Sequence, residues 1–131
     1  MSDLIEALAG HPASEVVRRS TLAGFLARHR RALLFFTGDV ARQPEGRDVA
    51  IVVRELLRQY DGRLALGLVD RRDETSLMAK TGVVVVPAVA FVADGRTTDV
   101  VARMRDWGAY ARAVERLFGS DTRDGATTGP A

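Results

Sequence analysis

The spacing of hydrophobic residues predicts two helices and then a buried strand near the start of the chain. Residues 3–8 place leucine and isoleucine at helical intervals over about two turns. A second helix is expected to begin at Ser20, whose hydroxyl can cap it, and to end in the cationic residues 28–31. The run ALLFF at 32–36 is continuously apolar, which is typical of a strand buried on both faces.

The middle of the chain predicts a helix between two strands, followed by a short helix. Residues 38–47 combine glycine, proline and charged residues and are expected to form a loop. Asp48 can cap a helix that runs to about residue 60, where Asp-Gly stops it. Residues 64–69 predict a second strand, and residues 73–80 predict a short helix that a glycine closes.

The last part of the pattern predicts a hairpin and a final amphipathic helix. The apolar run 83–93 indicates a strand that one proline interrupts. Asp-Gly at 94–95 is a hairpin turn signal, so residues 97–101 are expected to return as the next strand. Asp106 can cap a last helix, whose apolar face ends near residue 118.

These elements predict a three-layer α/β sandwich, in which a mixed central sheet of four to five strands is flanked by helices. The strand–helix–strand portion requires a parallel pair with a right-handed crossover, and the hairpin adds antiparallel strands. Residues 1–118 are expected to form this domain. Residues 119–131 contain no apolar anchor, so we expect a flexible C-terminal tail there.

Composition then excludes several kinds of chemistry. The 131-residue chain is 47% hydrophobic and 27% charged, as globular domains are, and it contains no cysteine. Disulfides, thiolate metal sites and thiol nucleophiles are therefore excluded for this chain. The net charge is only +2, and no basic stripe is interleaved with aromatic residues, so we expect no nucleic-acid partner.

The sequence also predicts where the protein acts. No run of 18 apolar residues occurs, so we expect no membrane insertion. The N-terminal sequence MSDLIEALAG lacks the basic start and the long apolar stretch of a secretory signal. A cytoplasmic location follows as the expectation.

Candidates for catalysis or metal binding are few. His11 and His29 are the two histidines, and they do not have the spacing of metal ligands. Asp70, Asp73 and Glu74 cluster after a predicted strand but are expected to be solvated loop carboxylates. No phosphate-binding loop or nucleophile-elbow motif occurs. We therefore expect no catalytic residue, no metal and no cofactor.

The order of elements and the segment AKTGVVVVPAVAFVADGR resemble the thioredoxin-like fold. In this segment Gly82 is followed five residues later by Pro87, then by a strand and the turn at 94–95. The resemblance implies that the bond before Pro87 is cis. A thioredoxin has its CxxC motif after the buried strand, where this chain has residues 37–48 without a sulfur atom. The resemblance is therefore to the scaffold without its redox pair.

A narrower resemblance is to the HyaE/HupG hydrogenase maturation proteins, over residues 15–118. It is carried by ALLFFTGDVARQPEGRDVAIVVREL, VVPAVAFVADGR and MRDWGAYARAVERL, in this order and spacing. The resemblance implies a cytoplasmic, non-catalytic chaperone for [NiFe] hydrogenase assembly. Its implied partner is the hydrogenase small-subunit precursor with its twin-arginine signal peptide, together with other hydrogenase maturation proteins.

In thioredoxin-like proteins three loops form a peptide groove at one end of the sheet. Here these loops correspond to residues 38–45, 86–87 and 104–105. A cis-proline would expose the backbone groups of the preceding valine for strand-like pairing. Asp39, Glu45 and Asp48 are the candidate carboxylates for binding the arginines of a signal peptide. The predicted peptide-binding residues are Asp39, Val40, Pro44, Glu45, Val86, Pro87, Met104 and Arg105.

Simpler interpretations stay open for several of these residues. Pro87 can be an ordinary proline at the start of a strand, and Trp107 can belong to the core. Asp39, Glu45 and Asp48 can be turn formers and a helix cap. For the whole protein, the alternatives are a thioredoxin-fold enzyme that uses an external thiol such as glutathione and a generic protein-interaction scaffold.

Overall fold

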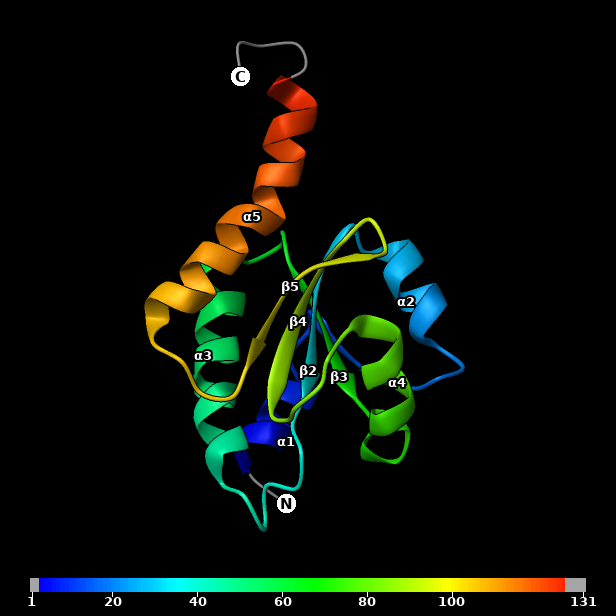
Figure 1. Ribbon diagram of the computed structural model, residues 1–131, viewed down its shortest axis with the longest axis vertical. Coiled ribbons are helices and arrows are strands. Elements are labelled where there is room, and N and C mark those ends of the chain that lie inside the picture. The colour runs from blue at the N-terminus through cyan, green and yellow to red at the C-terminus, as the bar shows by residue number, and fades with distance from the viewer. Residues whose placement is uncertain (1–2, 127–131) are drawn as a thin grey trace.

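A five-stranded mixed sheet lies between two layers of helices in the computed structural model, which describes residues 3–126 (Figure 1). The elements in chain order are α1 (Asp3–Ala9), β1 (Ser14–Val17), α2 (Leu22–Arg28), β2 (Arg31–Phe36), α3 (Glu45–Gln59), β3 (Ala65–Val69), η1 (Arg71–Asp73), α4 (Glu74–Thr81), β4 (Ala88–Ala93), β5 (Arg96–Ala102) and α5 (Trp107–Ala126). The predicted α/β class and the flanked sheet are confirmed.

The strands are ordered β1-β3-β2-β4-β5. β3 pairs in parallel with both β1 and β2, whereas β4 is antiparallel to β2 and β5. The sequence did not predict β1, which is a four-residue edge strand with one fully buried residue, Val17. Its pattern is too short to distinguish a strand from a loop, and only pairing with β3 shows it.

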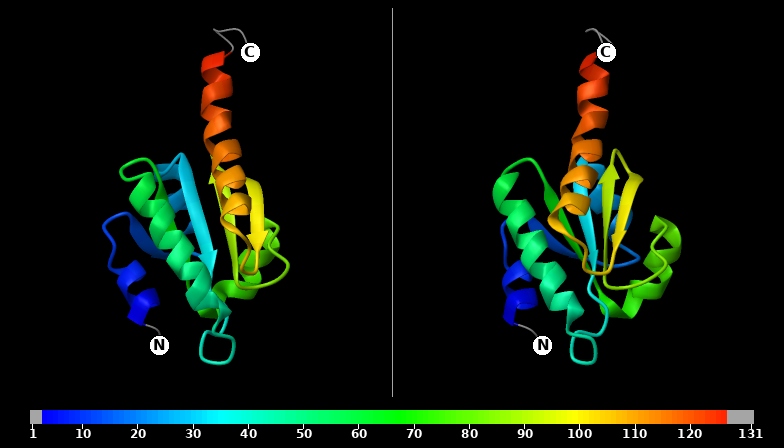
Figure 2. Two further views of the ribbon diagram at one scale, coloured as in Figure 1. Left: turned by 90° about the vertical axis from the view of Figure 1, so that its left-hand side faces the viewer. Right: turned by 60° about the vertical axis from the view of Figure 1, so that its left-hand side comes forward.

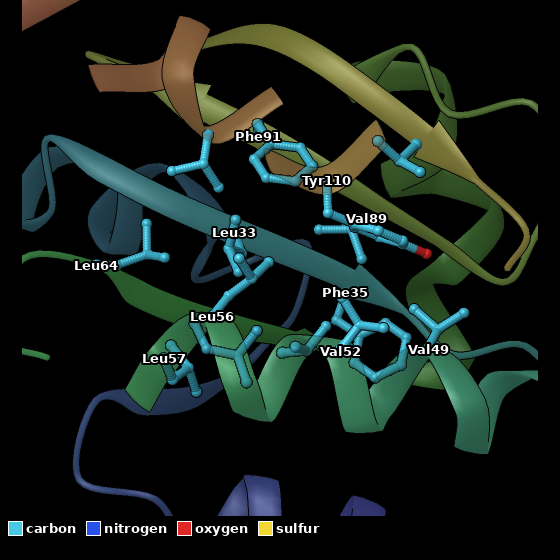
Figure 3. Close-up of a cluster of buried hydrophobic side chains, with 14 of the residues drawn as sticks. Leu33, Phe35, Val49, Val52, Leu56, Leu57, Leu64, Val89, Phe91 and Tyr110 are labelled. Carbon is cyan, nitrogen blue, oxygen red and sulfur yellow. The ribbon is translucent and has the colours of Figure 1, made fainter. Parts of the chain in front are cut away.

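The sheet has one hydrophobic core on each face. α1, α3 and α5 cover the first face, as Figure 2 shows. Figure 3 shows side chains of β2 and β4 directed toward α3, with Tyr110 of α5 beside them. α2 and α4 cover the second face, where Phe25 and Leu77 are fully buried. β2 contributes to both cores, which explains its continuous apolar run.

Two predicted helix starts are wrong. α3 begins at Glu45 after Pro44, so Asp48 lies in its first turn and is not the cap. A proline suits this position because it fixes the backbone near helical values and lacks an N–H that would stay unpaired. α2 begins at Leu22 after Thr21, so Ser20 does not cap it.

Two strand and helix ends also differ from the prediction. β4 begins at Ala88, and residues 83–86 form a connecting segment because Pro87 cannot donate to the sheet. Asp106 does cap α5, since its Oδ1 accepts a hydrogen bond from Ala109 N at 3.0 Å. α5 continues to Ala126, within the segment expected to be a tail. Residues 127–131 lie outside the described residues, and the flexibility of 119–131 stays a prediction.

Candidate functional site

Three loops meet at the end of the sheet where β2 and β5 finish and β4 starts (Figure 1). They connect β2 to α3 (37–44), α4 to β4 (82–87) and β5 to α5 (103–106). These are the loops in which the sequence places a peptide groove, and we call them the three-loop end.

The bond between Val86 and Pro87 is cis, as the resemblance predicts. Pro87 is buried, and Val86 is half-buried against the second core. Gly38 comes close to Val86: a Cβ atom built at Gly38 would lie 3.2 Å from Val86 Cγ2. Gly38 also has a φ of +68°, which favours glycine. The β2–α3 and α4–β4 loops therefore pack directly on each other.

The segment before Pro87 presents free backbone groups and apolar side chains. Among the described residues, the N–H and C=O groups of 84–86 have no hydrogen-bond partner. The side chain of Val84 is 84% exposed and that of Val85 is 42% exposed. An extended peptide could pair with these backbone groups and cover these side chains.

Arg103 connects the other two loops. Its N–H donates to the carbonyl oxygen of Pro87 at 2.7 Å, and its own carbonyl oxygen accepts from the Tyr110 hydroxyl at 3.1 Å. Its φ of +66° lies in the left-handed region, which is costly for a residue with a side chain. The conformation is held by contacts on three sides, the third being Glu45.

Glu45 joins the start of α3 to the β5–α5 loop. Its carboxylate accepts from Arg103 Nε at 2.9 Å and from the backbone N–H of Met104 at 2.7 Å. The Arg103 guanidinium and this N–H lower the pKa of Glu45. Glu45 therefore stays ionised and already has a cationic partner within the protein.

Asp39 and Asp48, the other two predicted carboxylates, carry no such partner in the described part of the chain. Asp39 is half-buried, and its Oδ1 accepts from the N–H of Ala41 at 3.2 Å, as in a turn. Asp48 is exposed in the first turn of α3. Both are thus open to a cationic ligand.

The remaining predicted residues divide between surface and core. Met104 and Trp107 are 42% and 43% exposed, and Pro44 and Arg105 are also exposed. Val40 is half-buried against the first core. Trp107 is therefore a surface residue at the three-loop end, and the simpler interpretation that it belongs to the core is wrong.

The sequence missed the role of Glu74. We expected a solvated carboxylate, but the side chain is buried. Its Oε2 accepts from the N–H of Gly38 at 3.1 Å, and its Oε1 pairs with Arg71. The first turn of α4 thus holds the β2–α3 loop. Both segments follow adjacent parallel strands, and only this topology brings them to the same edge of the sheet.

Arginines also engage the neighbouring carboxylates. Asp70 caps the turn that follows β3 and is paired with Arg72 and Arg18. The hydrogen bond from Arg72 lowers the pKa of Asp70 to about 2. Asp73 accepts from Arg19 N at 2.8 Å. Within residues 3–126, no group of three histidine, cysteine, aspartate or glutamate residues could hold a metal ion.

No helix in the described range is long and apolar enough to span a membrane. The model of the family described as Hydrogenase-1 expression protein HyaE matches residues 4–110. The chain belongs to the HyaE family. The chain is similar to the hydrogenase expression/formation protein HupG of Rhizobium leguminosarum bv. viciae, with 35% identity over 124 residues. The match covers 92% of this chain and 83% of the relative.

Solved structures agree with the HyaE-family assignment. The crystal structure of putative HupG from Rhodopseudomonas palustris has a TM-score of 0.56 and 35% identity, and the match covers 85% of this chain and 98% of that one. A mutant thioredoxin from Halobacterium salinarum has a TM-score of 0.64 and 21% identity, and the match covers 79% of this chain and 89% of that one. The second likeness concerns the fold alone. The thioredoxin-like fold and the predicted family are both confirmed.

Proposed function

We propose that this protein is a non-catalytic chaperone of [NiFe] hydrogenase maturation that binds the small-subunit precursor through its twin-arginine signal peptide in the cytoplasm. Membership of the HyaE family, which is named for hydrogenase expression, supports a role in hydrogenase maturation. The absence of cysteine means that this chain cannot supply a thiol of its own on the thioredoxin-like scaffold. Other maturation proteins are further candidates for partners.

The observation that carries the proposal is the segment before Pro87. Its free backbone groups and exposed valines lie where the three loops meet, so an extended peptide can be bound without dependence on its sequence. Met104, exposed in the β5–α5 loop of the three-loop end, adds an adaptable apolar contact. The proposed groove consists of Asp39, Val40, Pro44, Glu45, Val86, Pro87, Met104 and Arg105.

The arginines of a signal peptide require carboxylates. Asp39 and Asp48 are the candidates for direct contact, because an arginine–carboxylate pair is among the stronger charge-assisted interactions. Glu45 has a different part in the groove. It holds the backbone of Met104 and the side chain of Arg103, and so positions the third loop.

Titration calorimetry with a twin-arginine signal peptide tests the proposal. The native peptide should bind more tightly than a version in which both arginines are glutamine. Equal affinity for the two peptides would remove arginine recognition from the proposal. If neither peptide binds but the folded small-subunit precursor does, the contact lies elsewhere on the precursor. Turnover of a glutathione disulfide by the pure protein would contradict the non-catalytic role.

Substitutions locate the contact. Val85→Asp, Val86→Asp and Asp39→Lys should each weaken peptide binding about tenfold or more, since they place or reverse charge in the groove. Val86 also packs on the second core, so Val85→Asp is the cleaner variant. Ile51→Asp is its matched control, because Ile51 is also an exposed aliphatic residue (48%) but lies along α3. It should leave binding unchanged.

A further inference from the structure

A cavity of about 390 Å³ lies on the other side of the β2–α3 loop from Val86. Residues 37–41 form one wall, and residues 68–71 at the end of β3 form another. α1 and β1 contribute Ile5 and Val16. None of the residues of the α4–β4 or β5–α5 loops lines this cavity, so it lies beside the segment before Pro87 and shares only Asp39 and Val40 with the proposed groove.

The strand order explains why a cavity forms here. β2 and β3 are adjacent and parallel, and both end at this edge of the sheet. From there the chain continues to α3 on one face and to α4 on the other (Figure 1). Loops that leave neighbouring parallel strands in opposite directions open a crevice between them, and ligands of α/β proteins bind at such switch points.

The lining is mainly apolar. The apolar residues that line it are Ile5, Val16, Val40, Ala41, Leu68 and Val69. A concave site of this volume with apolar walls and a few polar groups has the character of a ligand pocket. An aliphatic or aromatic group would gain from leaving water there.

The charged groups around the cavity determine which kind of ligand residue can lie next to that apolar group. Asp70 is paired with Arg18 and Arg72, and Arg71 is paired with buried Glu74. Asp39 is the remaining ionisable residue of the lining, and no cation pairs with it in the described structure. Asp39 is therefore the one carboxylate of the lining that has no cationic partner within the described residues.

We infer that this cavity binds an apolar side chain of the partner peptide, and that Asp39 binds a basic residue directly beside that side chain. The inference rests on the proposed function, because the same loop would then contact the peptide on both of its sides. It adds to the arginine contact of the proposed groove a requirement for an apolar residue next to the arginine. Backbone pairing at 84–86 accepts any extended sequence, whereas the cavity requires a basic and an apolar residue in succession.

Methyl NMR with a minimal ligand tests the inference apart from the proposed function. N-acetyl-arginyl-phenylalanine amide should shift the methyl signals of Ile5, Val16 and Leu68 in a saturable way. The methyl signals of Val84 and Val85 should stay unchanged. Replacing arginine by citrulline, which is neutral but of the same shape, should weaken binding about fivefold. Asp39→Asn should remove this difference between the two ligands.

A pair of bulky substitutions tests occupancy. Ala41 lines the cavity, whereas Gln43 is exposed in the same loop and does not. Ala41→Trp should weaken the arginyl-phenylalanine ligand tenfold or more, and Gln43→Trp should change it less than twofold. Equal thermal stability of the two variants would confirm that the fold is kept.

The outcomes separate the two hypotheses. If the dipeptide shifts the cavity methyls but the signal peptide does not bind, the cavity is real and the proposed function fails. If the signal peptide binds equally to the wild type and to Ala41→Trp, the inference is overturned and the groove stands alone.

Discussion

At the scale of single residues, Gly24 and Gly46 both lie within helices but have opposite surroundings. A Cβ atom at Gly46 would lie 2.6 Å from the carbonyl oxygen of Thr37, whereas one at Gly24 would meet nothing within 4 Å. Gly46→Ala should therefore destabilise the protein by about 1–3 kcal/mol, because backbone atoms must move. Gly24→Ala should stabilise it by about 0.5–1 kcal/mol. Urea denaturation of both variants measures the difference.

If Gly46→Ala were as stable as the wild type, the start of α3 would not pack on the end of β2 as described. A second check uses the amide of Gly38, which lies next to Thr37. Its NMR signal should shift in Gly46→Ala and stay in place in Gly24→Ala.

The ion pair between Glu45 and Arg103 predicts a dependence of stability on pH. Because the pKa of Glu45 is lowered in the folded protein, its contribution is present above the ordinary glutamate range. The contribution is lost as the pH falls below about 4.3 and through the lowered pKa. In Glu45→Gln, stability should depend less on pH in this acidic window. Denaturation midpoints at several pH values measure this.

The control for this prediction is Arg103→Gln. It removes the main cause of the lowered pKa and should also flatten the acid dependence, although Met104 N–H still donates to Glu45. In the double variant, the pH dependence of stability could fall by the sum of the decreases seen in the two single variants. That would show that the two residues act independently. Such a result would contradict the pairing.

At the scale of elements, Glu74 joins α4 to the loop after β2. Glu74→Ala would leave the buried N–H of Gly38 without its partner, at a cost of about 1–3 kcal/mol. Glu74→Gln keeps an acceptor oxygen and should lose less. Chemical denaturation gives the stabilities, and hydrogen exchange at Gly38 gives the local effect. Fast exchange at this amide in the wild type would contradict the contact.

The elements also show which parts of the fold the sequence can predict. β2 was predictable because burial on both faces makes every position apolar. β1 was not, because it has four residues and its pairing with β3 is a property of the sheet. The start of α3 was misplaced by four residues, since Asp48 resembles a cap while Pro44 holds the cap position.

The candidate site shows the same division. The cis bond before Pro87 and the meeting of the three loops were predictable from the resemblance. The engagement of Glu45 by Arg103 and the burial of Glu74 were not, because both depend on residues far apart in the sequence. The cavity beside Asp39 is likewise invisible in the sequence, since its walls come from α1, β1, β3 and the β2–α3 loop.

At the scale of the whole molecule, one sheet supports two cores and should make unfolding cooperative. Leu56 belongs to the first core and Leu77 to the second, and both are fully buried. Leu56→Ala and Leu77→Ala should each cost about 2–5 kcal/mol. Each variant should still unfold in one transition, with far-UV circular dichroism and Trp107 fluorescence changing together.

A separate early transition in Leu77→Ala would show that the face covered by α2 and α4 unfolds on its own. In that case the second core would not unfold cooperatively with the first. Ile51→Ala is the control, because its half-exposed side chain should contribute far less than either leucine.

After β2 and β3 the chain continues to opposite faces of the sheet, and this arrangement has one more consequence. Leu68 belongs to the first core and Val69 to the second, and both line the cavity between the exits. A ligand in this cavity would contact residues that belong to the first core and to the second core. It would slow local opening on both faces at once, so that residues 38–41 and 70–73 would gain hydrogen-exchange protection in parallel as the ligand concentration rises.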